Sequence, residues 1–176
     1  MHQTDNLVPI TGIVYASKPA YSNKKVRKHV LEKGYIVALA ADYLTKHMSL
    51  EKEPIIVLKK MRNLKEHIVQ GQTFPSGRVE LDPTLPIEEL ILITTHEFVH
   101  LDQFEDGRLS FQTDNDGNFT HPIWQGVVHS LSLKEERDFD RYLSLPWERE
   151  AFTRANSVYK RVKKHLNKIV GPKTLK

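Results

Sequence analysis

Hydrophobic positions recur at helical spacing in two long segments of the chain. In residues 24–48 apolar side chains fall three or four positions apart, interrupted only by Gly34, which predicts a long packing helix in one or two pieces. A second helix is predicted from Pro146, which suits a first helical turn, to about Lys168. The polar residues 132–141 predict a further, exposed helix.

Extended segments lie between these helices. The β-branched run at residues 55–58 predicts a buried strand, and residues 67–74 and 77–82, joined by a Pro-Ser dipeptide, predict a hairpin. Apolar and charged residues alternate along its second piece, which is typical of a strand with one solvent-facing side. The residues expected to face solvent there are Arg78, Glu80 and Asp82.

A central helix is predicted over residues 87–105. Pro86 suits its first turn, and Gly107 lies where it would stop. Residues 90–93 are four adjacent aliphatics that cover every side of a helix, so we expect the core to surround this element. The segments that follow predict a hairpin turning at the Asp116-Gly117 dipeptide.

The order of elements predicts an α+β fold. We expect a single domain over residues 1–176, with a small mixed sheet packed on the central helix and further helices around it, because no repeat, low-complexity stretch or Gly/Ser-rich linker divides the chain.

Composition then limits the chemistry. The 176 residues include nine histidines and no cysteine, which excludes disulfides, thiolate metal sites and a cysteine nucleophile. Any metal ion must therefore be held by histidine and carboxylate side chains. The first residues lack the basic and apolar regions of a signal peptide, and no apolar stretch is long enough to span a membrane, so we expect a soluble, cytoplasmic protein without membrane partners.

The net charge of +4 is unevenly distributed. Residues 151–176 contain eight basic side chains and no acidic one, whereas residues 1–150 carry 18 basic against 22 acidic side chains. A basic helix of this kind is most often a solvated face and more rarely a surface for nucleic acid or an acidic partner.

The central helix carries the pattern His96-Glu97-Phe98-Val99-His100, an HExxH motif. Histidines four residues apart on a helix lie on one face, one turn apart, and can bind one metal ion. Glu97 then lies beside the metal, where it can act as a general base on water. The aliphatic surroundings of the motif favour a metal site over coincidence, because buried histidines need polar partners.

Catalytic zinc sites usually have three protein ligands. The best candidates for the third lie in the segment SLPWEREAF, where Glu148 and Glu150 fall at the start of the predicted last helix. Carboxylates are common in a first helical turn for electrostatic reasons alone, so one of the two is explained without a metal.

These motifs resemble the gluzincin group of zincin metallopeptidases, particularly the minimal minigluzincins. The similarity covers residues 87–105 and 142–155, and PWEREAF resembles the E-x-x-A pattern that supplies the third ligand. The layout, with Trp124 in a long insert and a compact LPWE box, also looks like small peptidase-like proteins of phages and mobile elements.

The resemblance implies a zinc-dependent hydrolase of peptide bonds, with one zinc ion per chain. By that match His96, His100 and Glu148 bind the zinc ion and Glu97 is the base. One position departs from the pattern: many gluzincins have an aspartate that orients a ligand histidine where this chain has Phe152. A partner for the histidines must then come from elsewhere, and the candidates are Thr95, Asp102 and Asp140.

The resemblance also concerns the substrate. In zincins an edge strand pairs with an extended peptide substrate, and residues 78–82 are the candidate for that strand here. An ordinary sheet strand without a substrate role is an equally good interpretation of these residues. A donor must stabilise the developing oxyanion, and Tyr142 is favoured because it lies six residues before Glu148. The other donors considered are His121, His129 and Tyr159.

Two alternatives to a peptidase remain. The chain could be a non-catalytic, zincin-like binding or assembly protein that uses its basic C-terminal helix, or its metal could hydrolyse another amide, such as a peptidoglycan cross-link. The segment Asp114 to Asn118 is similar to the start of a calcium loop, but Phe119 and Gln125 occupy positions that require glycine and glutamate, which favours a simple turn.

Overall fold

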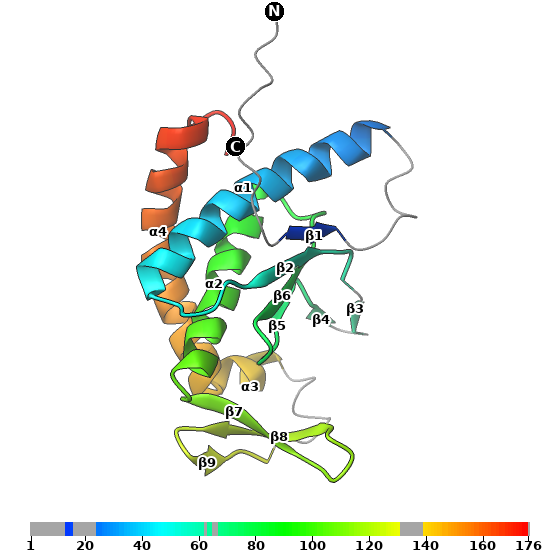
Figure 1. The fold of residues 1–176 in the computed structure, drawn as a ribbon, viewed down its shortest axis with the longest axis vertical. Helices are drawn as coiled ribbons and strands as arrows, with labels where there is room; N and C mark the ends of the chain where they lie inside the picture. Colours follow the sequence, from blue (N-terminus) through cyan, green and yellow to red (C-terminus); the bar gives the residue numbers. More distant parts are fainter. Residues whose placement is uncertain (1–12, 16–23, 62, 65–66, 131–138, 176) are drawn as a thin grey trace, which may run out of the picture.

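The structure, a computed structural model, describes residues 13–15, 24–61, 63–64, 67–130 and 139–175. Over these ranges the chain has an α+β fold, with helices gathered on one side of a small mixed sheet (Figure 1). The helices described are α1 (Lys24–Met48), α2 (Ile87–Glu105), α3 (Phe139–Ser144) and α4 (Pro146–Val170).

The main sheet has the strand order β1-β2-β6-β5. Its strands are β1 (Ile13–Tyr15), β2 (Ile55–Leu58), β6 (Arg78–Leu81) and β5 (Gly71–Thr73). β1, β2 and β6 are parallel, and β5 runs antiparallel to β6. Because β6 lies between β2 and β5, its backbone is hydrogen-bonded on both sides. The expectation that residues 78–82 form an edge strand is therefore wrong, and β5 takes that place.

The predicted hairpin is present but shorter than expected. β5 and β6 are joined by a tight turn in which the Gly77 amide donates to the Phe74 carbonyl at 3.0 Å, and Gly77 has a φ of 85° that glycine adopts without strain. The start of the first piece is not part of this hairpin. It forms β4 (His67–Ile68), which pairs with β3 (Asn63–Leu64) in a separate two-stranded sheet.

The prediction of one solvent-facing side for β6 is largely wrong. Arg78 is exposed, but Glu80 and Asp82 are only 3% and 6% exposed. Glu80 is buried in ion pairs with Lys59 and Arg78, and Asp82 accepts a hydrogen bond of 3.0 Å from the Met61 amide. These carboxylates are buried because long basic side chains and backbone donors cover them, which alternation alone does not reveal.

The helices predicted at residues 24–48 and 87–105 and from residue 146 are confirmed. α1 is one continuous helix through Gly34, and α2 begins and ends at the residues expected. α2 is the central element: it contacts α1, α4, β5 and β6 and contributes to a core shared with α1, α4, β2 and β6. In its aliphatic run Leu90 and Ile91 are fully inaccessible to solvent for this reason, whereas Leu92 and Ile93 are half-buried.

A second, three-stranded sheet follows α2. It contains β7 (Leu109–Thr113), β8 (Phe119–Trp124) and β9 (Val127–Val128), in that order. The predicted turn at Asp116-Gly117 joins β7 to β8, and Asp114 accepts hydrogen bonds from the amides of Asp116 and Asn118. The segment is a turn, as expected. Trp124 and Leu109 from this sheet form a small buried cluster with Trp147, at the start of α4.

The C-terminal part of the described chain packs against the rest. α4 ends within two residues of the predicted limit, and Leu175 beyond it is buried in the main core. Of the exposed helix predicted for residues 132–141, residues 131–138 lie outside the described residues, and α3 begins at Phe139. None of the described helices is long and apolar enough to cross a membrane.

Candidate metal centre

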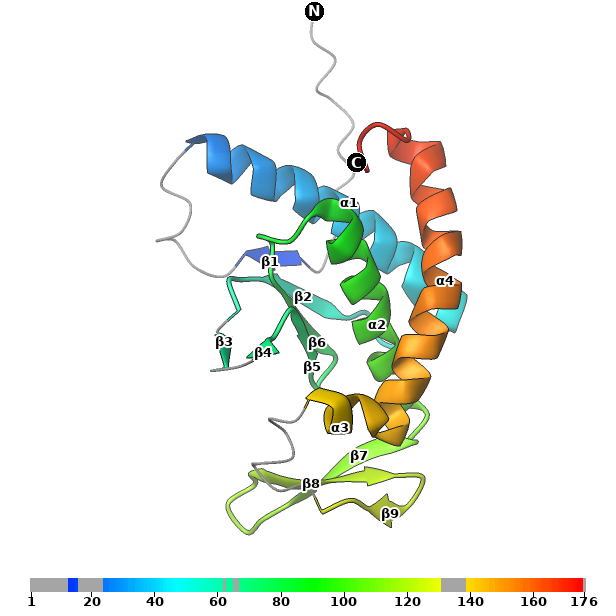
Figure 2. The ribbon, with the colours of Figure 1, turned by 180° about the vertical axis from the view of Figure 1, so that it is seen from behind.

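The candidate metal centre is built on two helices that lie side by side, α2 and α4, and the first turn of α4 contributes to it (Figure 2). His96 and His100 lie one turn apart on α2, both buried at 7% exposure, and their ring centroids are 4.7 Å apart. They are buried because the apolar sides of α2 pack into the core on all sides, so the histidines and Glu97 are forced to find polar partners within the protein.

Glu148 meets these histidines from α4. Pro146 occupies the beginning of that helix, where its missing amide hydrogen costs nothing, and places Glu148 in the first turn. The Glu148 side chain is buried, with Oε2 3.2 Å from His96 Nε2 and Oε1 3.4 Å from His100 Nε2. The two Nε2 atoms are themselves 3.1 Å apart. Two imidazole nitrogens and one carboxylate group therefore face one another inside the protein.

This spacing suits a metal ion. Ligand atoms bound to tetrahedral zinc at 2.0–2.1 Å lie about 3.3–3.4 Å from one another, close to the separations found here. The chemistry of the donors agrees, since two imidazole nitrogens and a carboxylate are a usual zinc ligand set. In addition, Glu148 Oε2 is buried without a hydrogen-bond partner. The three residues are identified as a group that could hold a metal ion.

In the chain without a metal, His100 and Glu148 stabilise each other's charged forms. Burial alone would lower the pKa of His100, but its hydrogen bond to Glu148 and the charge of that carboxylate outweigh burial and raise the pKa to about 9. Burial acts to raise the pKa of Glu148, yet its contacts with His100 and His96 lower it to about 2. The site therefore stabilises the ionised carboxylate of Glu148 next to a positive charge. A metal cation can supply that charge in place of the proton on His100.

Glu97 lies beside the ligand group and not within it. Its carboxylate Oε2 accepts a hydrogen bond of 2.7 Å from Thr73 Oγ1, on the edge strand β5. Gly71, on the same strand, allows this approach: a Cβ atom there would lie 2.7 Å from Glu97 Oε1 and from Ile93 Cγ2. Burial raises the pKa of Glu97, although the two histidines act in the opposite direction. A carboxyl group with a raised pKa is suited to accept and return a proton near neutral pH.

Tyr142 reaches the same site from α3. Its hydroxyl donates a hydrogen bond of 2.6 Å to Glu148 Oε1, and burial together with the charge of Glu148 raises its pKa well above the ordinary value. The hydroxyl therefore remains protonated and available as a donor. Of the other donors considered, Tyr159 lies near Lys163 and Glu88.

His121 and His129 are not among the residues that meet Glu148. His129 packs edge-on against Trp147, with ring centroids 5.3 Å apart. His121 lies on β8, and its Nδ1 is buried without a hydrogen-bond partner. Neither histidine has a described contact with His96, His100 or Glu148. Among the four donors considered, Tyr142 is the one with such a contact in the described part of the chain.

Glu150 lies outside the metal centre. It forms ion pairs with Arg108 and Arg154, and these two arginines also pair with Asp102 at 2.9 and 2.5 Å. The Arg108 and Arg154 side chains lower the pKa of Glu150 against the effect of burial. Of the two glutamates left open by the sequence, Glu148 is the one that faces the histidines, and Glu150 helps to tie α4 to the end of α2.

The expected partners of the ligand histidines are found in other roles. Thr95 donates to the Ile91 carbonyl within α2, Asp102 belongs to the arginine cluster, and the side chain of Asp140 lies outside the described part of the chain. Phe152 packs on His96, with ring centroids 4.5 Å apart, and His96 Nδ1 is buried without a partner.

Sequence reasoning missed Gln103, which accepts a hydrogen bond from His100 Nδ1 at 2.8 Å. Its spacing three residues after His100, on a helix predicted to be central, was the available signal. Comparison of the chain with protein-family models, with curated proteins and with solved structures finds no match.

Proposed function

We propose that the chain is a zinc-dependent peptide-bond hydrolase of the gluzincin type, with His96, His100 and Glu148 as zinc ligands. The observation that carries the proposal is that the buried Nε2 atoms of His96 and His100, 3.1 Å apart, face the two oxygens of Glu148 at 3.2 and 3.4 Å, beside the carboxylate of Glu97. Zinc at this position would supply a Lewis acid that polarises a carbonyl group and makes water more acidic.

The residues of the chain have distinct roles in this proposal. Glu97, held by Thr73, takes a proton from water as the water attacks the carbonyl carbon, and it delivers that proton to the leaving amine. Tyr142 donates a hydrogen bond at the carbonyl oxygen as negative charge develops there. Its hydroxyl already lies at the site, where it donates to Glu148 Oε1 at 2.6 Å.

The experiment combines metal analysis with cleavage. The purified chain is stripped with chelator, reloaded with zinc, and assayed on a library of quenched fluorescent peptides. We expect one zinc ion per chain and cleavage that chelator abolishes. Glu97→Gln should retain the zinc ion and lose cleavage, whereas Glu105→Gln, on the same helix, should retain both. A wild-type chain that folds without binding zinc would contradict the proposal.

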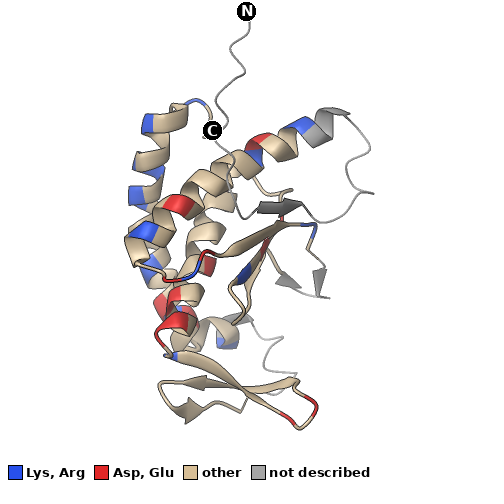
Figure 3. Ribbon diagram, in the orientation of Figure 1, with Lys and Arg blue, Asp and Glu red and all other residues tan. Residues whose placement is uncertain are grey.

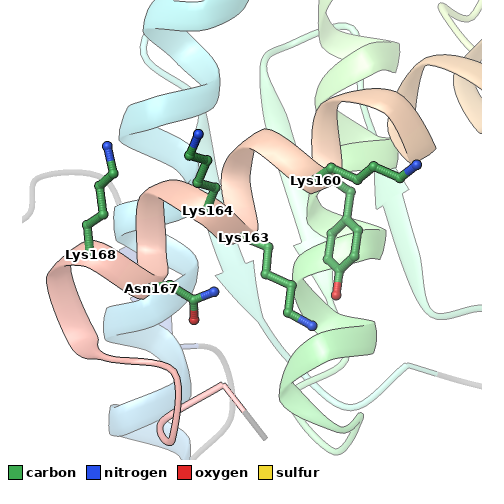
Figure 4. Close-up of a pocket in the computed structure, with 6 residues that line it drawn as sticks. Lys160, Lys163, Lys164, Asn167 and Lys168 are labelled. Atoms are coloured by element: carbon green, nitrogen blue, oxygen red, sulfur yellow. The ribbon is translucent and has the colours of Figure 1, made fainter.

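A second candidate function rests on the basic part of α4. Lysines and arginines follow the outer side of this helix, away from its acidic beginning (Figure 3). A surface hollow there is lined by residues of α4 alone, and Figure 4 shows its lysine side chains extending from the helix. The lining residues are Tyr159, Lys160, Lys163, Lys164, Asn167 and Lys168.

The charges of this hollow are only partly balanced. Lys163 forms an ion pair with Glu88, but in the part of the chain that the structure describes no carboxylate lies within ion-pair distance of Lys160, Lys164 or Lys168. These three lysines are spaced four residues apart, where like charges on a helix repel. A polyanion would offset this repulsion, which supports a nucleic-acid-binding or assembly role.

Fluorescence anisotropy with a labelled DNA duplex and a labelled single-stranded RNA tests this alternative. Binding should weaken steeply with salt and be reduced by replacing the three lysines with glutamine. A triple control at Lys28, Lys46 and Lys52 removes the same charge elsewhere. Absence of binding at low salt would eliminate the alternative and leave the peptidase proposal untouched.

A further inference from the structure

Gln103 has a buried side chain with two polar ends, and both ends have partners. It lies one turn beyond His100 on α2 and is 0% exposed. Its Oε1 lies 2.8 Å from His100 Nδ1, and its Nε2 lies 3.0 Å from the Trp147 carbonyl oxygen. A side chain that is fully buried and fully paired in this way is held in a single orientation.

The Trp147 carbonyl determines which way the Gln103 amide faces. A carbonyl oxygen can only accept, so the NH₂ group of Gln103 must point to Trp147. The opposite orientation would place two carbonyl oxygens 3.0 Å apart with no proton between them. Gln103 Oε1 therefore faces His100, and since this oxygen can only accept, His100 Nδ1 must carry the hydrogen.

This assignment bears directly on the metal centre. A neutral His100 with its hydrogen on Nδ1 has a lone pair on Nε2, which faces His96 Nε2 at 3.1 Å and Glu148 at 3.4 Å. Trp147 is also the residue that precedes Glu148. The same amide therefore touches the ring of one ligand and the backbone next to another, on two different helices.

We propose that Gln103 is a positioning residue of the metal centre, which fixes His100 with Nε2 free to bind a metal and holds the first turn of α4 so that Glu148 meets both histidines. The inference rests on the proposed metal site. His96 has no equivalent support, because its Nδ1 is buried without a partner. Among the described residues, His100 is thus the histidine of the pair whose Nδ1 has a hydrogen-bond partner.

The test measures zinc affinity by competition with a chromophoric chelator. Gln103→Met keeps the length of the side chain and removes both hydrogen bonds. The matched control is Thr94→Val, on the same helix and equally buried, whose hydroxyl bonds only to the Leu90 carbonyl. We expect Gln103→Met to weaken zinc binding roughly 10- to 100-fold and the control to leave it within about threefold. If Gln103→Met does not fold, Gln103→Glu, which keeps an acceptor for His100, is measured against the same control.

Two further readouts separate positioning from general destabilisation. In the zinc-loaded wild-type chain, nuclear magnetic resonance should show a His100 Nδ1–H proton that exchanges slowly; it should be lost in Gln103→Met and kept in Thr94→Val. In a His100→Ala background, Gln103→Met should cost much less zinc affinity than in the wild type. Equal zinc binding by wild type and Gln103→Met would overturn the inference alone. No zinc binding by the wild type would overturn the proposed function and this inference together.

Discussion

The Nε2 atoms of His96 and His100 lie 3.1 Å apart inside the protein, both facing the carboxylate of Glu148. Two neutral imidazole nitrogens that face each other at this distance repel unless a proton or a cation lies between them. The arrangement therefore requires either a proton or a metal cation between the two rings.

Replacing Glu148 should have a different effect from replacing Glu150. Glu148→Gln removes the negative charge from the ligand group and should weaken zinc binding by at least about 100-fold, which isothermal titration calorimetry can measure. Glu150→Gln removes only contacts to Arg108 and Arg154, so zinc affinity should be unchanged while stability to urea falls by about 1–2 kcal/mol. The reverse order of effects on zinc would assign the third ligand to Glu150.

The stability of the metal-free chain should depend on pH in a definite way. The pKa of His100 is raised from 6.5 to about 9, so its contribution is complete below pH 6.5 and is lost as the pH rises toward 9. The pKa of Glu148 is lowered from 4.5 to about 2, so its contribution is complete above pH 4.5 and is lost as the pH falls toward 2.

Urea unfolding in the presence of chelator should accordingly show greatest stability between pH 4.5 and 6.5, the window bounded by these two ordinary values. The decrease from pH 6.5 to 9 should disappear in His100→Ala. Saturating zinc should reverse it, since zinc competes with the proton. A metal-free stability that rises from pH 6.5 to 9 would contradict the assigned pairing.

Gly71 should be required for catalysis more than for zinc binding. A methyl group at this position would collide with the Glu97 carboxylate and with Ile93, so Gly71→Ala should displace the base and lower kcat at least about tenfold. Zinc content should remain near one per chain because neither contact involves a ligand. Thr73→Ser serves as a control that keeps the hydroxyl on Glu97, and cleavage by this variant should be close to wild type. Unaltered kcat in Gly71→Ala would rule out the proposed placement of the base.

Tyr142→Phe should lower kcat more than it lowers zinc affinity. The variant removes the hydroxyl that bonds to Glu148 Oε1 but keeps the ring, and loss of one oxyanion donor typically costs about 10²–10³ in kcat. Steady-state kinetics and metal titration on the same preparation check this ratio. If zinc affinity falls as much as kcat, Tyr142 acts by supporting Glu148 and not by contacting the substrate.

Much of the fold could be predicted from local pattern. The aliphatic run of α2 and the prolines before α2 and α4 give helix limits that agree with the structure within two residues. The place of each strand in the sheet could not be predicted, because strand order depends on which segments meet in space. For this reason β6 was expected at the edge that β5 occupies. Glu80 and Asp82 were assigned to solvent because their basic and backbone partners lie far away in the sequence.

The candidate site likewise has residues that the local sequence pattern predicts and residues whose place depends on tertiary packing. The HExxH spacing places His96, Glu97 and His100 on one helical face whatever surrounds them. The choice between Glu148 and Glu150 depended on how α4 packs. In the structure Glu148 faces the histidines, whereas Glu150 pairs with Arg108 and Arg154. The spacing of Gln103 from His100 was visible in the sequence, but its second partner was not, because the Trp147 carbonyl lies 44 residues further along the chain.

The most direct measurement is the position of zinc in crystals of the zinc-loaded chain, located by anomalous scattering at the zinc absorption edge. The account predicts one peak per chain, about 2.0–2.2 Å from His96 Nε2, His100 Nε2 and a carboxylate oxygen of Glu148. A zinc ion bound elsewhere on the chain, or these three side chains in place with no peak between them, would contradict it.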